Sequence, residues 1–325
     1  MKAGETFPRE DAEVCISLEN HPKPEKRVWP EAQWHHRKAV YDSRVHRVLD
    51  PLLEHRLRRE AHPVHDFLFT YYRFRPAQLM TWSPGVGQTL EGGHVLDLPF
   101  WSAHHDGSGE LDSTRFPEKR RESLKWVCHL LSSTARREPV FSCYGLHEWA
   151  MLYRAQKARH QVPLRVSPRE LEVVVEKLNV RCTHFDAFRF FTAPAVPRNR
   201  HRLTRDNRLE FEQPGCVHAN MDLYKWAHKF YPWVQSEVIL DAFELALEAR
   251  RLDMQASPYD LTAWGFVPVA IETPRGRLEY EERQRHLTGL AALLRQRLKD
   301  ELERIIQLLY HECGFTSCQG HPVPA

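Results

Sequence analysis

The feature that most constrains the fold is a helical repeat of apolar residues near the end of the chain. Between residues 277 and 310, apolar side chains recur at helical spacing and share one side of the segment: Leu287, Leu290, Leu294, Leu298, Ile305 and Leu309. This period predicts a long amphipathic helix whose apolar side faces a core. Together with similar, shorter segments, it predicts a mainly α fold.

The same spacing, together with helix start signals, predicts helices at residues 31–59, 65–72, 117–137, 146–159, 168–179, 217–230 and 235–254. Ser167 and Glu170 have the spacing of a capping box, which places a helix start at Pro168. Pro51 predicts a kink or break in the first helix. A short strand is predicted at Phe266–Ile271.

Two long segments are predicted to be loops. Residues 76–116 are rich in glycine and proline, and residues 192–215 contain three prolines and five arginines. Loops of this length within a domain are uncommon and are often functional. A chain of 325 residues is within reach of one large domain. We therefore expect a single helical domain at 31–312 with two long loops and a small β element, an extended arm at 1–30 and a tail at 313–325.

Composition narrows the class of protein. The formal charge is +3 with a pI near 8.4, which is milder than the strongly basic balance typical of nucleic-acid proteins. The N-terminus has no apolar signal core and no apolar run reaches about 18 residues, so we expect a cytoplasmic protein without a membrane partner. The seven cysteines are scattered, which does not indicate a disulfide framework. Cys313 and Cys318 are either a metal or redox pair or part of the tail.

Titratable residues lie among aromatic and apolar residues in segments 182–191 and 212–226, a placement that favours buried polar groups and a functional site. His184 and Asp186 share one side if their segment is extended. His218 and Asp222 are four apart and share one side of a helix. Such a pair either joins a site or stabilises the helix locally by about 0.2–0.5 kcal/mol.

A preceding helix adds another histidine and another carboxylate. The five candidate ligands for iron or another divalent metal are His147, Glu148, His184, His218 and Asp222. Histidine and carboxylate ligands with open positions are typical of non-haem iron enzymes. The alternative is a hydrogen-bonded structural network. This set predicts a helical metalloenzyme that acts on a small molecule.

Other features point to DNA. The turn Ser83–Thr89 resembles the hairpin of helix-hairpin-helix proteins, and Asp106 follows near the distance of their catalytic aspartate, although Glu91-Gly92-Gly93 interrupts the helix expected next. The alternative is a plain glycine turn. In the loop 198–208, three arginines are candidate phosphate ligands or members of a solvated loop: Arg200, Arg202 and Arg205.

Several segments of the chain resemble the sequences of a bacterial family commonly labelled 3-methyladenine DNA glycosylase. They are residues 62–72, 143–151, 184–191, 213–226 and 252–261. The resemblance implies a DNA base-excision glycosylase, needing no cofactor, that releases alkylated purines such as 3-methyladenine from damaged DNA. In that function, an extruded base stacks on Trp149 or Tyr224. A carboxylate, Asp186, Asp222 or Glu148, stabilises the sugar cation or orients the attacking water.

Overall fold

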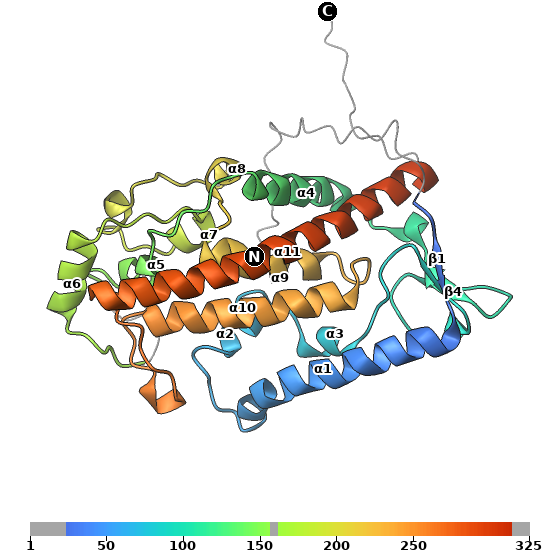
Figure 1. The fold of residues 1–325 in the computed structure, drawn as a ribbon, viewed down its shortest axis with the longest axis horizontal. Helices are drawn as coiled ribbons and strands as arrows, with labels where there is room; N and C mark the ends of the chain where they lie inside the picture. Colours follow the sequence, from blue (N-terminus) through green and yellow to red (C-terminus); the bar gives the residue numbers. More distant parts are fainter. Residues whose placement is uncertain (1–23, 157–161, 314–325) are drawn as a thin grey trace, which may run out of the picture.

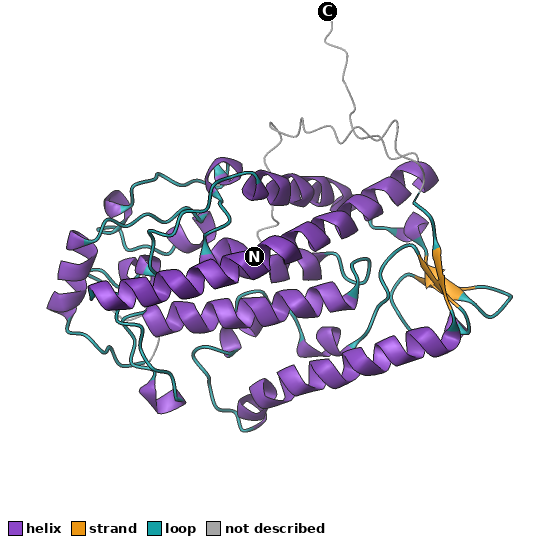
Figure 2. Cartoon of the chain, viewed as in Figure 1, coloured by secondary structure: helices purple, strands orange, loops and turns teal. Residues whose placement is uncertain are grey.

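The computed structural model describes residues 24–156 and 162–313. Helices form most of this part, and a small sheet lies at one end (Figure 2). The mainly α fold with a small β element is confirmed. Among the described residues, no helix combines the length and the apolar character needed to cross a membrane.

Three helices form the centre of the molecule. They are α9 (Val217–Lys229), α10 (Ser236–Ala256) and α11 (Pro274–Cys313). Each packs on the other two, with α10 and α11 antiparallel neighbours in the chain (Figure 1). Most residues of α9 and α10 are buried, including charged ones. The buried polar side chains of these two helices therefore face other protein groups instead of water.

Other helices cover this centre. Helix α1 (Glu31–Leu57) contacts α10 and the short α3 (Pro76–Met80), while α4 (Arg121–Ala135) packs on α11. Helix α1 continues through Pro51, so the break predicted there is wrong. Helix α6 (Pro168–Lys177) begins with the predicted capping box of Ser167 and Glu170.

The sheet lies elsewhere than predicted. Its order is β1 (Arg27–Trp29), β2 (Gln88–Leu90), β4 (Gly109–Leu111) and β3 (Trp101–Ala103), with β1 parallel to β2 and the other pairs antiparallel. The predicted strand at Phe266–Ile271 is absent, and this described segment is a loop. Strands of three residues are too short to show the alternation on which strand prediction depends.

The predicted loop 76–116 thus contains α3, the sheet and 3₁₀ turns at η1 (Gly93–Val95) and η2 (Ser113–Arg115). A third such turn, η3 (Glu118–Arg120), precedes α4.

Three short helices differ from the predictions. Helices α2 (Asp66–Thr70) and α5 (Leu146–Ala150) are shorter than predicted, and α7 (Phe185–Phe188) is helical where an extended segment was considered. Loop 192–215 contains η4 (Val196–Arg198) and α8 (Arg208–Phe211). Cys313 ends α11, and Cys318 is outside the described residues.

Candidate functional site: two buried polar clusters

Two groups of buried histidines and carboxylates meet at the centre of the fold. The first, here the Asp253 cluster, consists of His147, His218 and Asp253. In each cluster, one candidate ligand atom per residue lies within 4.8 Å of the others. The second, here the Asp222 cluster, consists of His184, Asp186 and Asp222.

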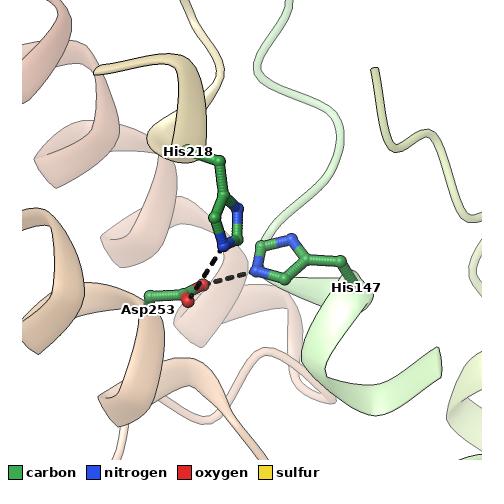
Figure 3. A group of neighbouring side chains, drawn as sticks. All are labelled: His147, His218 and Asp253. Carbon is green, nitrogen blue, oxygen red and sulfur yellow. Dashed lines mark hydrogen bonds and ion pairs between the residues drawn. The ribbon is translucent and has the colours of Figure 1, made fainter. Parts of the chain in front are cut away.

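Three helices each contribute one residue to the Asp253 cluster (Figure 3). His147 comes from α5, His218 from the first turn of α9, and Asp253 from the last two turns of α10. His147 Nε2 lies 2.6 Å from Asp253 Oδ1, and His218 Nε2 lies 3.9 Å from Asp253 Oδ2. The two imidazole rings approach edge to face with centroids 4.4 Å apart. Both ring Nε2 atoms therefore point at one carboxylate.

The carboxylate and the two imidazoles differ in charge. Burial opposes a charge on His147, but Asp253 overcomes it through its own charge and hydrogen bond and raises the His147 pKa well above 6.5. Burial, followed by the charge of His147, lowers the pKa of His218 to about 3. His218 is therefore a neutral imidazole at neutral pH, which is the form that binds metals.

Polar neighbours hold the Asp253 cluster in place. Arg250 Nη1 donates to Asp253 Oδ2 over 3.2 Å and to Glu148 Oε1 over 2.9 Å. The thiol of Cys143 lies 3.5 Å from His147 Nδ1, on the opposite side of the ring from Asp253. Metal-binding histidines are commonly oriented in this way, through a hydrogen bond to the second ring nitrogen.

Some buried polar atoms of this region have no hydrogen-bond partner within the described part of the chain. They include His218 Nδ1, and Nε and Nη2 of Arg250. An unpaired buried donor costs about 1–3 kcal/mol. His218 and Arg250 both line a cavity of about 20 Å³, together with Glu148 and Phe190. A cavity of this size holds about one water molecule.

The Asp222 cluster is already neutralised by cations. Arg208 donates to Asp186 and, through Nε over 2.5 Å, to Glu212. Lys225 Nζ lies 3.2 Å from Asp186 Oδ2 and 3.9 Å from Asp222 Oδ2. Burial disfavours the charge on Asp186, but Arg208 and Lys225 hold its pKa well below the usual range.

Asp222 has two further partners. The hydroxyl of Tyr72 donates to Asp222 Oδ1 over 2.8 Å, and His184 Nε2 lies 3.3 Å from Asp222 Oδ2. Although burial disfavours its charge, Lys225 and His184 lower the Asp222 pKa to about 2. The rings of His184 and His218 stack with centroids 5.4 Å apart. The two clusters therefore form one continuous buried polar region.

All five predicted metal ligands, namely His147, Glu148, His184, His218 and Asp222, lie in this region, but they divide between two centres. Sequence reasoning missed Asp253 and Arg250, which complete the Asp253 cluster, and Arg208, which neutralises the other cluster. The signal for Asp253 was its position between Leu252 and Met254 on the buried side of a helix.

The residues predicted to contact DNA differ in exposure: the two aromatic residues are buried and the three arginines are exposed. Trp149 and Tyr224 are both 0% exposed, and Trp149 Nε1 donates to the carbonyl of Ala256, so neither ring offers an open face in this conformation. Their stacking role stays a prediction. The side chains of Arg200, Arg202 and Arg205 are exposed, as phosphate contacts require.

The turn at residues 83–89 packs inside the protein. The backbone N–H of Ser83 donates to Ser236 Oγ, and that of Val86 donates to the carbonyl of Trp233. These donors are therefore used internally, which favours a plain glycine turn over a phosphate-binding hairpin. Asp106 is an exposed turn residue that accepts hydrogen bonds from Ser108.

No family model, no curated protein and no solved structure matches the chain. The resemblance to DNA glycosylases therefore stays a prediction.

Proposed function

We propose that the protein is a metal-dependent enzyme whose single metal ion binds to His147, His218 and Asp253. The observation that carries this proposal is the convergence of the two Nε2 atoms on the Asp253 carboxylate. Two histidines and one carboxylate are the ligand set of many non-haem iron enzymes. Iron is therefore the first candidate, ahead of other divalent metals.

The residues fit such an ion in three respects, with the metal displacing the proton that Asp253 stabilises on His147. His218 is held neutral, and neither of its ring nitrogens has a hydrogen bond to another described residue. Cys143 supports the far side of the His147 ring. Three protein ligands leave coordination positions open, and His218 borders the small cavity. A bound metal would supply Lewis-acid or redox chemistry at these open positions.

The same cavity indicates the substrate class. Arg250 and Glu148 both line it, and two nitrogens of Arg250 lack a partner among the described residues. Arginine binds carboxylates with paired hydrogen bonds. We therefore propose a small substrate with a carboxylate or similar anionic group, held by Arg250. Because the cavity holds about one water, the exposed Phe190 at its edge must move when substrate enters.

The test is metal content after purification and reconstitution with iron, manganese or zinc. We expect about one ion per chain in the wild type and loss of that ion in His218→Ala. The matched control is His184→Ala, which removes another buried histidine, from the neighbouring cluster, and should leave the metal bound. Protein that stays metal-free with all three metals contradicts the proposal, as does a retained ion in His218→Ala.

We also propose, as a second candidate, the excision of alkylated bases such as 3-methyladenine from DNA. It is supported by the resemblance and by the exposed arginines of loop 198–208. Asp186, which borders the cavity, and Asp222 are the carboxylates proposed for the reaction. The test is release of free base from methylated DNA, with and without a chelator. Full activity of both Asp186→Asn and Asp222→Asn would remove these roles.

A further inference from the structure

A large groove lies apart from the buried clusters. Its volume is about 1160 Å³, and residues of α3, the η3 turn and the end of α9 line it. The ring of Phe74 at its wall packs on Tyr72 and Tyr224, and the hydroxyl of Tyr72 reaches Asp222. Aromatic side chains therefore separate the groove from the buried polar region.

The groove is strongly cationic although the whole chain is not. Its lining contains five basic side chains: Arg73, Arg75, Lys119, Arg120 and Lys229. Among the described residues that line it, Asp97 is the only acidic one. The chain as a whole carries a formal charge of only +3. This concentration of positive charge in one concave surface favours an anionic ligand.

Arg120 is the most informative of these residues. It is partly buried, and its guanidinium makes no hydrogen bond or ion pair with another residue in ranges 24–156 and 162–313. Burial alone lowers its pKa, with no carboxylate acting in the opposite direction. A partly desolvated cation without a partner costs stability in the free protein. Its presence in the groove is explained if a ligand supplies the missing negative charge.

Two further features indicate a prepared site. His228 is 5% exposed, stacks on Phe74 with centroids 3.8 Å apart, and its Nε2 has no hydrogen-bond partner in the described part of the chain. Arg73, at the rim, has a φ of +58°, a conformation that non-glycine residues rarely adopt. Such strain persists where surrounding contacts enforce it, and it is common at ligand sites.

We infer that this groove, defined by Arg73, Arg120 and His228, binds a phosphate-bearing small molecule. Arginine is the side chain best suited to phosphate, because its planar fork donates two parallel hydrogen bonds. The volume is slightly above the usual range for small-molecule sites, so the groove accommodates an organic phosphate as large as a nucleotide. The five basic side chains line one concave surface, which favours a compact anion over a long polyanion.

The experiment is calorimetric titration with two probes, inorganic pyrophosphate and ATP, at low salt and in excess chelator without magnesium. We expect both to bind, since phosphate is the shared chemistry, and tighter binding of ATP would assign part of the groove to the organic group. Arg120→Gln should weaken both by about 10- to 100-fold, the loss of one charge-assisted contact. The matched control is Arg169→Gln, an exposed arginine of α6 outside the groove.

Two comparisons distinguish a loss of phosphate binding from misfolding and from loss of the proposed metal. Because the Arg120 guanidinium pairs with no other described residue, its replacement leaves no buried group without a partner. Arg120→Gln should therefore melt at or above the wild-type temperature. Binding should persist in His218→Ala, so failure of the metal proposal leaves this inference intact. Absence of heat with both probes overturns it, as does equal weakening by the Arg120 and Arg169 variants. A single-stranded oligonucleotide that binds more tightly than ATP, regardless of Arg120, also overturns it.

Discussion

The two buried clusters contain similar residues but differ in how their charge is balanced. In the Asp222 cluster, Arg208 and Lys225 contact the carboxylates of Asp186 and Asp222 directly. In the Asp253 cluster, one carboxylate faces two imidazoles, and Arg250 is its only arginine or lysine partner among the described residues. The first arrangement is complete without a ligand.

The difference shows why the presence of metal-type ligands does not define a metal site. A divalent ion placed at the Asp222 cluster would lie close to Arg208 and Lys225, and like charges at that distance repel strongly when buried. At the Asp253 cluster, Arg250 is shared with Glu148, and His218 is neutral with no hydrogen-bond partner for its Nδ1 among the described residues. The contrast favours a structural role for the Asp222 cluster and supports the metal site that we propose at the Asp253 cluster.

The largest expected effect tests the structural role. Arg208→Met leaves Asp186 and Glu212 buried with their main cation removed and takes one cation from beside Asp222, and breaking a buried ion pair costs about 3–5 kcal/mol. Urea denaturation gives the change in the free energy of unfolding. The control is Arg189→Met, because Arg189 lies 3.6 Å from Asp186 but is 44% exposed, and exposed pairs contribute about 0–1 kcal/mol. Equal losses in both variants would contradict the difference between the clusters.

The second effect compares the two central carboxylates. Saturating metal at about 100 times its dissociation constant stabilises a folded protein by about 2.7 kcal/mol. We expect this increase in wild type and in Asp222→Asn, but not in Asp253→Asn. Thermal unfolding with and without metal measures it relative to each variant's own metal-free state. Loss of the increase in Asp222→Asn alone would move the metal site to the other cluster.

Much of the helical framework follows from local sequence patterns. The apolar repeat predicts α11, and Ser167 and Glu170 predict the start of α6. The sheet is not predictable in this way, because three-residue strands are held by pairing across the chain and by close packing at glycine. A Cβ on Gly109 would lie 2.6 Å from Trp101 Nε1, for example. Such contacts are tertiary and leave no periodic signal.

The candidate site is predictable only in part for a related reason. Pairs such as His218 and Asp222 are visible because four residues span one helical turn. The split of these two residues between different clusters depends on how α5, α7 and α10 pack around α9. Arg208 lies in a predicted loop, so nothing local indicated that it would be buried among three carboxylates.

A third prediction concerns the support of His147. Cys143→Ala removes the thiol 3.5 Å from His147 Nδ1, and losing such a partner typically lowers metal affinity by about 10- to 100-fold. Competition with a chelating dye measures the affinity. The control is Cys182→Ala, because the buried Cys182 thiol donates to the backbone carbonyl of His184 instead. If Cys182→Ala has the larger effect, the support proposed for His147 is wrong.

The smallest effect uses pH to separate the clusters in metal-free protein. His147 has a pKa well above 6.5 and His218 a pKa of about 3, so the folded pair holds one proton over a wide range. Below pH 6.5 the unfolded chain protonates both histidines, so stability falls as pH decreases toward 3. Above 6.5 the unfolded chain releases both protons while folded His147 keeps its own, so stability falls again until pH passes the raised pKa. This pair therefore contributes most near pH 6.5.

The Asp222 cluster responds in another window. The pKa of Asp222 is lowered from 3.8 to about 2, so its contribution is complete above pH 3.8 and is lost as pH falls through about 2. Denaturation between pH 4.5 and 8.5 in chelator thus avoids the Asp222 titration, and comparison with a variant separates His218 from other buried histidines with lowered pKa values, such as His65 and His228. We expect His218→Asn to flatten the acidic side of the wild-type profile by up to about 1.4 kcal/mol per pH unit, one proton's worth. Identical acidic sides in the variant and the wild type would mean that His218 is not held neutral, and the charge difference between the clusters would be lost.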